Sequence, residues 1–292
     1  MSVAKQEIEP EPGPDAERES GYDRIAEDYA RHWGPVIRPA AEQVLDLVAP
    51  AMMAALAAGS EPRLLDVGTG TGTLAIAAIE RWPALRVTGV DPSAGMLEIA
   101  REASDQRLSQ QAGRYLTEVA YADELPFGAA SFDLAVSSFV LQLVPSRAAA
   151  LREIRRVLAP GGTFAWVAWQ RSQQPYEPDR IANEVLDEAG FDPPESDGPS
   201  ADIASAGAAA LAMRRAGFRD VRARPEELAH PWDAAGYLAF LTEFDEQSLF
   251  AELEPDERVD IEREIRRRLD RLTPEQLTLR LPVIYAAGRA GS

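Results

Sequence analysis

The segment LLDVGTGTGTLAIAAI, residues 64–79, decides the fold. An apolar strand pattern runs into Gly68, Gly70 and Gly72, and an apolar helix pattern starts directly behind them. Glycine has no Cβ, so the backbone can turn sharply there and approach a ligand closely. The free N–H groups at the start of the helix add hydrogen-bond donors. The segment therefore predicts a strand, a ligand-binding loop and a helix in direct succession.

The spacing of the glycines narrows the choice of ligand. A phosphate-binding GxxxxGK[ST] loop needs a lysine, and the only lysine of the chain is Lys5. A dinucleotide loop favours G-x-G-x-x-G, whose third glycine would fall on Thr73. The pattern is instead D-x-G-x-G-x-G, with Asp66 at the end of the strand. A carboxylate there disfavours a pyrophosphate and suits a ligand with an ammonium or sulfonium charge.

Two later carboxylates follow predicted strands. Asp91 ends an apolar run, where an acid in a parallel α/β sheet accepts hydrogen bonds from ribose hydroxyls. That feature fits NAD and S-adenosylmethionine equally, and Pro92 behind it also fits a helix start. Asp123 can accept a hydrogen bond from the amino group of an adenine, while Leu125 and Met96 can supply apolar surfaces for the faces of its ring. The three carboxylates and the glycine loop are predicted to converge on one adenosyl-sulfonium ligand.

Strand and helix patterns alternate through the middle of the chain. The predicted strands are 63–67, 86–90, 115–121, 132–137 and 163–169, and the predicted helices are 73–81, 94–103 and 147–158, with APGG (159–162) as a turn. Such alternation predicts βαβ units, and therefore an α/β fold with helices on both faces of a largely parallel sheet.

The two ends of the chain have different patterns. The first 20 residues carry six carboxylates and few apolar side chains, which predicts a disordered tail. Aromatic and apolar residues at helical spacing follow from Tyr22, with Pro35 and Pro39 as interruptions before a second helix at 40–58. After residue 169 we expect helices at 181–189, 203–216 and 232–272, a strand at 218–223 and a last strand in which Pro282 marks an edge or a bulge.

Composition excludes several functions. The formal charge of −18 repels phosphate backbones and anionic membranes, so a nucleic-acid substrate is not expected. The basic run 266–268 has the pattern of an exposed helix face. The chain has no cysteine, which excludes disulfides and thiolate-bound metals, and no metal site is predicted. No secretory signal or apolar run of membrane-spanning length is seen, and we expect a cytoplasmic protein.

Taken in order, these motifs resemble the class I S-adenosylmethionine-dependent methyltransferases, and within them the small-molecule branch that includes ubiquinone and menaquinone biosynthesis enzymes. The resemblance rests on DVGTGTG, GVDPSAGM, ADELPF, SFDLAVSSFVLQ and LREIRRVLAPGG, and later on AMRRAGFRDVRA and LRLPVIYAAGR. It implies a Rossmann-like seven-stranded sheet ordered 3-2-1-4-5-7-6 with the last strand antiparallel, and a helical cap.

The resemblance also assigns roles to residues. It places the methionine part of S-adenosylmethionine among Asp66, Gly68, Gly70 and Gly72, the ribose on Asp91 with Pro92, and the adenine among Met96, Asp123, Glu124 and Leu125. Ser138 and Phe139 would face the ammonium and the methyl group, and Tyr22 and Tyr29 would belong to a lid helix over the cofactor. The product would be S-adenosylhomocysteine.

The resemblance implies a division of the chain as well. A tail (1–20), lid helices (21–59) and a cofactor-binding core (60–170) come first. A cap insertion (171–202), a late helix and strand of the core (203–230), a helical cap insertion (231–274) and a final strand (275–292) follow.

The sequence constrains the catalytic residues less than the cofactor-binding residues. Many relatives have histidine at the position of Gln142, which makes this glutamine a poor candidate base. His32 and His230 are the candidate general bases, each of which also fits a structural role. The acceptor is expected to be a small apolar or aromatic molecule, methylated on oxygen, nitrogen or carbon. A non-catalytic adenosyl-binding module and an NAD-dependent oxidoreductase are the alternatives, and the oligomeric state stays open, a homodimer included.

Overall fold

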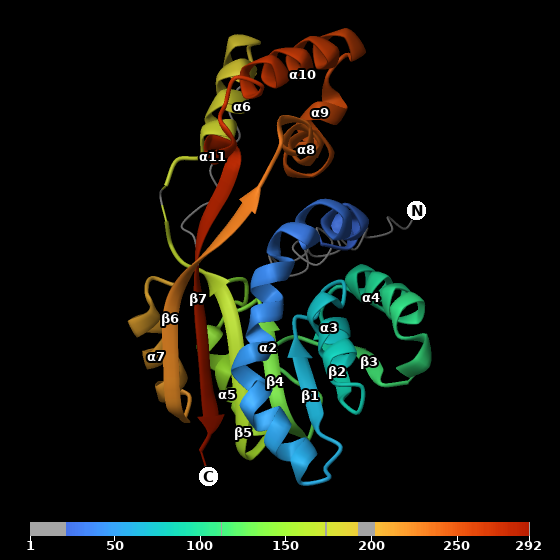
Figure 1. Cartoon of the computed structure of the whole chain (residues 1–292), viewed down its shortest axis with the longest axis vertical. Helices are drawn as coiled ribbons and strands as arrows, with labels where there is room; N and C mark the ends of the chain where they lie inside the picture. The colour runs from blue at the N-terminus through green and yellow to red at the C-terminus, as the bar shows by residue number, and fades with distance from the viewer. Residues whose placement is uncertain (1–21, 112, 173, 192–201, 292) are drawn as a thin grey trace, which may run out of the picture.

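The computed structural model describes residues 22–111, 113–172, 174–191 and 202–291. The tail predicted for residues 1–20 lies outside these ranges, as do residue 292 and most of the proline-rich segment before residue 202. The described strands form one seven-stranded sheet (Figure 1). They are β1 (Arg63–Val67), β2 (Arg86–Asp91), β3 (Tyr115–Val119), β4 (Phe132–Ser138), β5 (Leu158–Trp169), β6 (Phe218–Pro231) and β7 (Thr278–Ala290).

The strand order confirms the expected α/β architecture. It runs β3-β2-β1-β4-β5-β7-β6, with the first five strands parallel and β7 antiparallel to both of its neighbours. The predicted order 3-2-1-4-5-7-6 and the antiparallel last strand are therefore correct. The carboxyl ends of β1, β2 and β4 meet at one edge of the sheet, which is where ligands bind in such folds.

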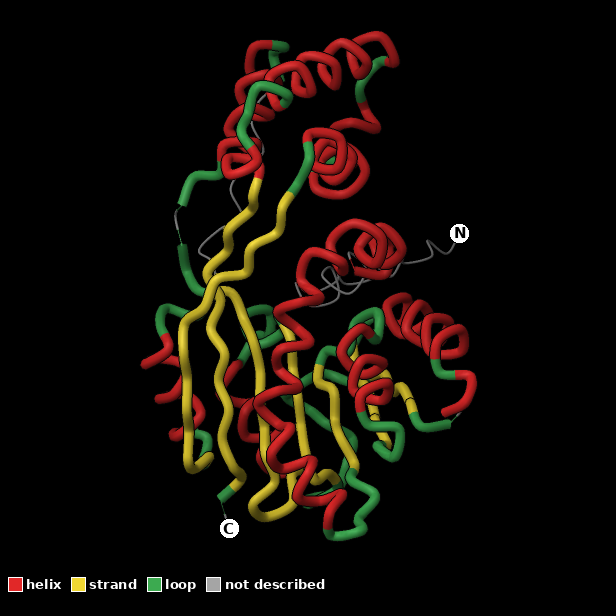
Figure 2. Tube along the Cα trace, viewed as in Figure 1, coloured by secondary structure: helices red, strands yellow, loops and turns green. Residues whose placement is uncertain are grey.

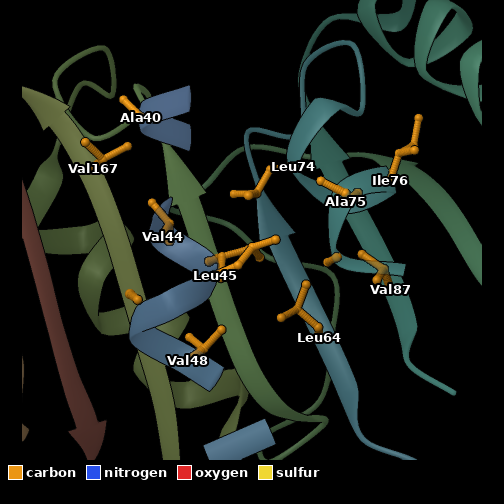
Figure 3. Packing of buried hydrophobic residues seen from close by; sticks show 14 of the residues in the cluster. Ala40, Val44, Leu45, Val48, Leu64, Leu74, Ala75, Ile76, Val87 and Val167 are labelled. Carbon is orange, nitrogen blue, oxygen red and sulfur yellow. The ribbon is translucent and has the colours of Figure 1, made fainter. Parts of the chain in front are cut away.

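Helices cover both faces of the sheet (Figure 2). On one face lie α2 (Gly34–Ala57) and α3 (Thr73–Arg81), and on the other α5 (Arg147–Val157) and α7 (Ala206–Arg215); α4 (Ala94–Arg107) packs beside β2 and β3. Val44, Leu45 and Val48 of α2 point at the sheet (Figure 3) and are buried. Each such side chain contributes about 1.5–3 kcal/mol of burial free energy. This packing holds the strand ends in place.

The N-terminal helix runs on through the prolines that were predicted to interrupt it. Residues 22–28 are helical, the π-helical turn η1 (Tyr29–Trp33) follows, and α2 continues to Ala57. Pro35 does not break the chain because it lies in the first turn of α2, where an N–H has no obligatory partner. The wider π turn precedes it, and Pro39 is accommodated within α2.

This stretch, Tyr22–Ala57, is the one helix in the described part of the chain that is long and apolar enough to cross a membrane by length and composition. The sequence prediction of no spanning segment considered only uninterrupted apolar runs. The inner face of the helix is buried against β4, β5 and α3, which is the environment of a core helix.

The APGG segment is part of β5 and not a separate turn. Phe132 pairs with Leu158 and Leu134 with Thr163, so five positions on β5 stand opposite two on β4. The surplus residues form a bulge in which Gly161 adopts a φ of 79°. Pro282 lies on β7 before that strand reaches its first ladder partner on β5: it pairs with Glu227 of β6, and its carbonyl accepts the N–H of Gln170, directly after β5. The residue is thus only partly at an edge, as predicted.

A helical cap stands beyond the sheet, where β6 and β7 extend as a two-stranded ribbon (Figure 1). It contains α6 (Glu177–Glu188), α8 (Ala234–Phe240), the π turn η3 (Leu241–Asp245), α9 (Gln247–Glu252), α10 (Pro255–Leu269) and α11 (Pro274–Leu277), packed around a core of its own. The helical stretch predicted for 232–272 is divided into several helices, because Glu246 and Leu253 leave the helical conformation. The strand predicted for 218–223 continues to Pro231 because it pairs with β7 along its whole length.

Candidate cofactor-binding site

A cavity of about 970 Å³, open solvent at its mouth included, lies at the carboxyl ends of β1, β2 and β4. Residues from the glycine loop, from the start of α4, from the segments that follow β3 and β4, and from the N-terminal helix line it. They are Tyr22, Tyr29, Gly68, Gly70, Asp91, Pro92, Ser93, Met96, Ala120, Tyr121, Ala122, Asp123, Ser138, Phe139, Val140, Leu143, Val144 and Pro145.

The three loop glycines are required for different reasons. All have positive φ, where side chains with a Cβ are strained. A Cβ on Gly68 would lie 2.1 Å from Val140 Cγ2, and one on Gly72 would lie 3.1 Å from Ala100 Cβ. A Cβ on Gly70 would meet no protein atom within 4 Å, although Gly70 lines the cavity. Gly68 and Gly72 therefore permit packing of the loop, whereas Gly70 leaves the cavity open.

Asp91 holds the glycine loop against the end of β2. Its Oδ2 accepts the Gly70 N–H at 2.9 Å and its Oδ1 accepts the Ser93 N–H at 3.0 Å. Each oxygen retains capacity for a further donor, such as a hydroxyl. Burial raises the pKa of Asp91 from 3.8 to about 6, the nearby Asp23 adds to the rise, and the two backbone bonds oppose it. The carboxylate is thus buried, oriented and able to accept more hydrogen bonds.

Asp66 lies beneath the loop and outside the cavity lining, unlike its predicted placement. Its Oδ2 accepts the Thr69 hydroxyl at 2.8 Å, and that hydroxyl lies 2.8 Å from the Tyr115 hydroxyl. Its Oδ1 has no hydrogen-bond partner among the described residues. Burial raises the pKa of Asp66 from 3.8 to about 7, and the charge of Asp91 raises it further. Asp66 therefore supports the loop from below.

The other predicted cofactor residues divide into two groups. Tyr22, Tyr29, Pro92, Met96, Asp123, Ser138 and Phe139 come together on the lining. Gly72, Glu124 and Leu125 do not line it. Leu125 is buried, its N–H donates to Glu153 and its carbonyl accepts from Arg156, so both of its main-chain groups are already engaged.

The two candidate bases lie away from the cavity lining. His32 Nε2 lies 3.2 Å from Glu243 Oε2, without hydrogen-bond geometry, and links the N-terminal helix to the cap. His230 packs edge-on against Trp232 near the base of the cap, and burial lowers its pKa. Neither histidine lines the cavity, and their catalytic assignment stays a prediction.

Sequence reasoning missed two residues that organise the cavity mouth. Ser93 caps α4 by accepting the Met96 N–H, a role that a serine behind Asp-Pro could have signalled. Asp23 Oδ1 accepts the Ser93 hydroxyl at 2.5 Å and the Gly95 N–H at 2.9 Å. These bonds fasten the N-terminal helix over the cavity. Only a three-dimensional arrangement could reveal them, since 70 positions separate Asp23 from Ser93.

The charged side chains that line the cavity are all acidic. Asp91 and Asp123 line it, and no arginine, lysine or histidine is found among the described lining residues. In the same described ranges no group of three or more histidine, aspartate or glutamate side chains could hold a metal ion. The site therefore favours a ligand with hydroxyl and amino donors and a positive charge.

The strand order and this cavity are those expected from the resemblance to the class I S-adenosylmethionine-dependent methyltransferases. Residues 64–162 match a family model described as a methyltransferase domain. S-adenosylmethionine is the cofactor of this class, and the residues present fit it: oriented carboxylates face the cavity and Gly70 leaves room for close approach.

Curated relatives resemble part of the chain. A malonyl-[acyl-carrier protein] O-methyltransferase from Geobacter sulfurreducens is 36% identical over 148 residues, 50% of this chain and 51% of that protein. A ubiquinone/menaquinone biosynthesis C-methyltransferase from Geotalea daltonii is 39% identical over 101 residues, 34% of this chain and 42% of that protein. The matched region thus spans about half or less of these relatives.

Solved structures share the fold over most of the chain. A candidate sarcosine dimethylglycine methyltransferase from Galdieria sulphuraria superposes with a TM-score of 0.54 at 16% identity, over 93% of this chain and 98% of that one. The YcgJ protein from Bacillus subtilis superposes with a TM-score of 0.52 at 19% identity, over 80% of this chain and 93% of that one. At such identities the likeness describes the fold alone.

Asp91→Ala is expected to weaken binding of S-adenosylhomocysteine by about 2 kcal/mol, roughly thirtyfold, because hydrogen bonds to a charged group are lost. Isothermal titration measures the effect. Asp105→Ala, which removes an exposed carboxylate from the last turn of α4, outside the cavity lining, is the control and should leave the affinity unchanged. An Asp91→Ala dissociation constant equal to that of the parent protein would remove Asp91 from the ribose site.

Proposed function

We propose that this protein transfers the methyl group of S-adenosylmethionine to a small-molecule acceptor. The observation that carries the proposal is the cavity in which the glycine loop, Asp91 and Asp123 meet without any basic lining side chain in the described chain. The family match over residues 64–162 supports it. The anionic surface and the absence of cysteine support a cytoplasmic location and a substrate other than nucleic acid.

Each part of the cofactor has a corresponding group in the cavity. Asp91 would hold the ribose hydroxyls, and Asp123 with Met96 the adenine. Gly68 and Gly70 would accommodate the methionine part, with Ser138 and Phe139 beside the methyl group. When bound, the cofactor supplies a methyl group on a sulfonium: the acceptor forms a bond to that carbon, the C–S electron pair returns to sulfur, and the acceptor loses a proton.

The protein contributes alignment and exclusion of water. Holding the acceptor atom, methyl and sulfur in line lowers the barrier without a strong base. The hydroxyl of Tyr29 is unsuited to act as a base near neutral pH, because burial and the nearby Tyr22 and Asp91 raise its pKa. The fastening of Asp23 to Ser93 and Gly95 keeps the N-terminal helix over the cavity.

The acceptor site is proposed to be apolar and aromatic. Phe139, with a φ of 57°, lies on the cavity wall, and its ring centroid is 4.0 Å from that of Trp169. Trp33 continues this row, with its centroid 6.0 Å from Trp169 and 5.6 Å from Phe240 in the cap. An aromatic surface thus connects the cofactor cavity with the cap.

A groove between the N-terminal helix and the cap offers a path by which the acceptor can reach the cofactor cavity. It shares Tyr22 and Tyr29 with the cofactor cavity and is lined further by Trp33 and Phe244, among others. The Tyr29 ring lies 6.2 Å from Phe244 and forms part of the partition between the two spaces. We therefore place the entry of the acceptor here.

Binding and turnover assays test the proposal. Isothermal titration should give measurable binding of S-adenosylmethionine and S-adenosylhomocysteine and none of NAD. Binding of NAD alone would overturn the assignment in favour of an oxidoreductase. A panel of phenolic, quinone-precursor, amine and carrier-bound acyl acceptors with methyl-labelled cofactor should then show transfer to a phenolic or quinone-type member. Cofactor binding without transfer to any member would favour the non-catalytic alternative.

Phe244→Ala is expected to raise the acceptor KM about tenfold, some 1.4 kcal/mol, through lost aromatic contact, while the dissociation constant for S-adenosylhomocysteine stays unchanged. Steady-state kinetics with the best acceptor of the panel gives the KM. Val259→Ala trims an exposed apolar side chain elsewhere in the cap and serves as the control. An unchanged KM, or an equal loss of cofactor affinity, would contradict the placement of the acceptor.

A further inference from the structure

A second large groove lies toward the opposite end of the sheet from the cofactor cavity. It measures about 1370 Å³, open solvent included, and is lined by the C-terminal half of α2 and by the β6–β7 pair near the C-terminus. Figure 1 shows the arrangement of these elements. Its walls differ in character. The α2 wall is apolar and the strand wall is basic, with Arg222 and Arg289 on the strands and Arg214 from α7.

Arg222 and Arg289 are neighbours on one face of the sheet. Arg222 pairs across the ladder with Ala287, two positions from Arg289 on the same strand, and both arginines line the groove. Side chains at such diagonal positions are within reach of each other. Two cations held side by side repel, so the arrangement is unfavourable unless an anion lies between them.

Neither of these arginines forms an ion pair with a carboxylate of the described residues. Most arginines in the described part of the chain lie within 4.0 Å of a carboxylate, as expected in a chain with 48 acidic and 30 basic residues. No carboxylate of the described residues lies that close to Arg214, Arg222 or Arg289. The one acid on the groove wall, Asp220, leaves them without an ion pair. The groove therefore carries uncompensated positive charge on an acidic protein.

A strained bulge helps to aim Arg222. Arg219 pairs with Arg289 and Arg222 with Ala287, so β6 contains one extra residue there. Asp220 within it has a φ of 51°, which is unfavourable for a residue with a Cβ. Bulges of this kind redirect side chains and are common at functional places in sheets. Without the extra residue, the positions after it would change faces of the sheet.

The apolar wall indicates what the anion is attached to. Leu47, Pro50, Ala51 and Ala54 of α2 face the groove across from the arginines. The small Pro50, Ala51 and Ala54 leave space beside the strands for an aliphatic or flat group. Arginine forks match the oxygen geometry of phosphate well.

We propose that this groove binds a phosphate monoester carried on an apolar body, with Arg222 and Arg289 on the phosphate, Arg214 beside it, and the α2 wall against the apolar part. This site is separate from the cofactor cavity, so it does not depend on the proposed methyl transfer.

Titration calorimetry with hexyl phosphate, inorganic phosphate and hexanol tests the site. Hexyl phosphate should bind at least tenfold more tightly than inorganic phosphate, and hexanol should show no measurable binding. The double variant Arg222→Gln/Arg289→Gln should lose at least tenfold in affinity for hexyl phosphate. Ala54→Asn, which places an amide on the apolar wall, should reduce the preference for hexyl phosphate over inorganic phosphate.

Controls separate this site from general charge and from folding. Arg271→Gln removes an exposed arginine from the cap, outside the groove, and should leave hexyl phosphate binding unchanged. All variants should bind S-adenosylhomocysteine like the parent protein, since they lie far from that cavity. Equal affinity for hexyl phosphate and inorganic phosphate, or unchanged binding by the double variant, would overturn the proposal. Binding to phosphatidylglycerol vesicles without binding of soluble hexyl phosphate would overturn it in favour of a membrane-surface contact.

Discussion

Gly70→Val is expected to weaken S-adenosylhomocysteine binding roughly a thousandfold, about 4 kcal/mol, in a protein that still folds. A side chain at this position would meet no protein atom within 4 Å of its Cβ, because it would extend into the cavity. It would therefore occupy ligand space instead of colliding with the core. Titration calorimetry gives the affinity, and circular dichroism with thermal melting reports the fold.

The positive φ of Gly70 adds backbone strain that has to be separated from the steric effect. Gly59→Val is the matched control: Gly59 also has a positive φ, 75°, with open space around its Cβ, but it lies at the end of α2 away from the cavity. The Gly59→Val variant should lose about as much free energy of unfolding as Gly70→Val and should keep full affinity for S-adenosylhomocysteine. Gly68→Ala should act through the fold, since its Cβ would collide with Val140. If Gly70→Val bound the cofactor as the parent does, the ligand would not approach the loop.

Asp66→Asn is expected to make the cofactor-free protein more stable above neutral pH, by up to about 4 kcal/mol at pH 8. Burial raises the folded-state pKa of Asp66 from 3.8 to about 7, so the folded protein holds this proton more tightly than the unfolded chain does. Stability is then lost as the pH rises from about 4 to about 7. At about 1.36 kcal/mol per pH unit, this range of roughly 3 units gives the figure quoted.

Urea unfolding at pH 5 and pH 8 measures this effect. The parent protein should lose stability between the two values, and Asp66→Asn should lose much less. Some loss should remain, because burial also raises the pKa of Asp91 to about 6. Asp105→Asn, at an exposed position on α4, should follow the parent protein. A parent protein equally stable at both pH values would show that Asp66 is not desolvated beneath the loop.

The cofactor half of the molecule could be predicted from sequence because its signals are local. The glycine loop, the strand ends and the α3 pattern each lie within a few residues, and β1 and α3 have the predicted limits. Their alternation fixes parallel pairing and brings Asp91 and Asp123 to one edge of the sheet. The position of Asp66 could not be predicted in this way, since alternation along β1 does not reveal whether a side chain near the end of the strand points into a cavity or beneath a loop.

The remaining features depend on contacts between distant segments. The helix through Pro35 and Pro39 is held by packing on the sheet, which outweighs the local preference for a break. The length of β6 follows from its pairing with β7, whose partner residues lie 72 positions later in the chain for Phe218 and 47 positions later for Pro231. The hydrogen bond between Asp23 and Ser93 likewise connects elements that are distant in the sequence. The basic groove at Arg222 is also formed by elements that no short motif connects.

The two-stranded ribbon at the far ends of β6 and β7 has an evolutionary consequence. Because the helical part above it enters between β5 and β6 and again between β6 and β7, its sequence can be exchanged without altering the strand ends that face the adenosyl group. Descendants of one ancestor could thus acquire new acceptors by remodelling these two inserts while inheriting an unchanged methyl-donor half.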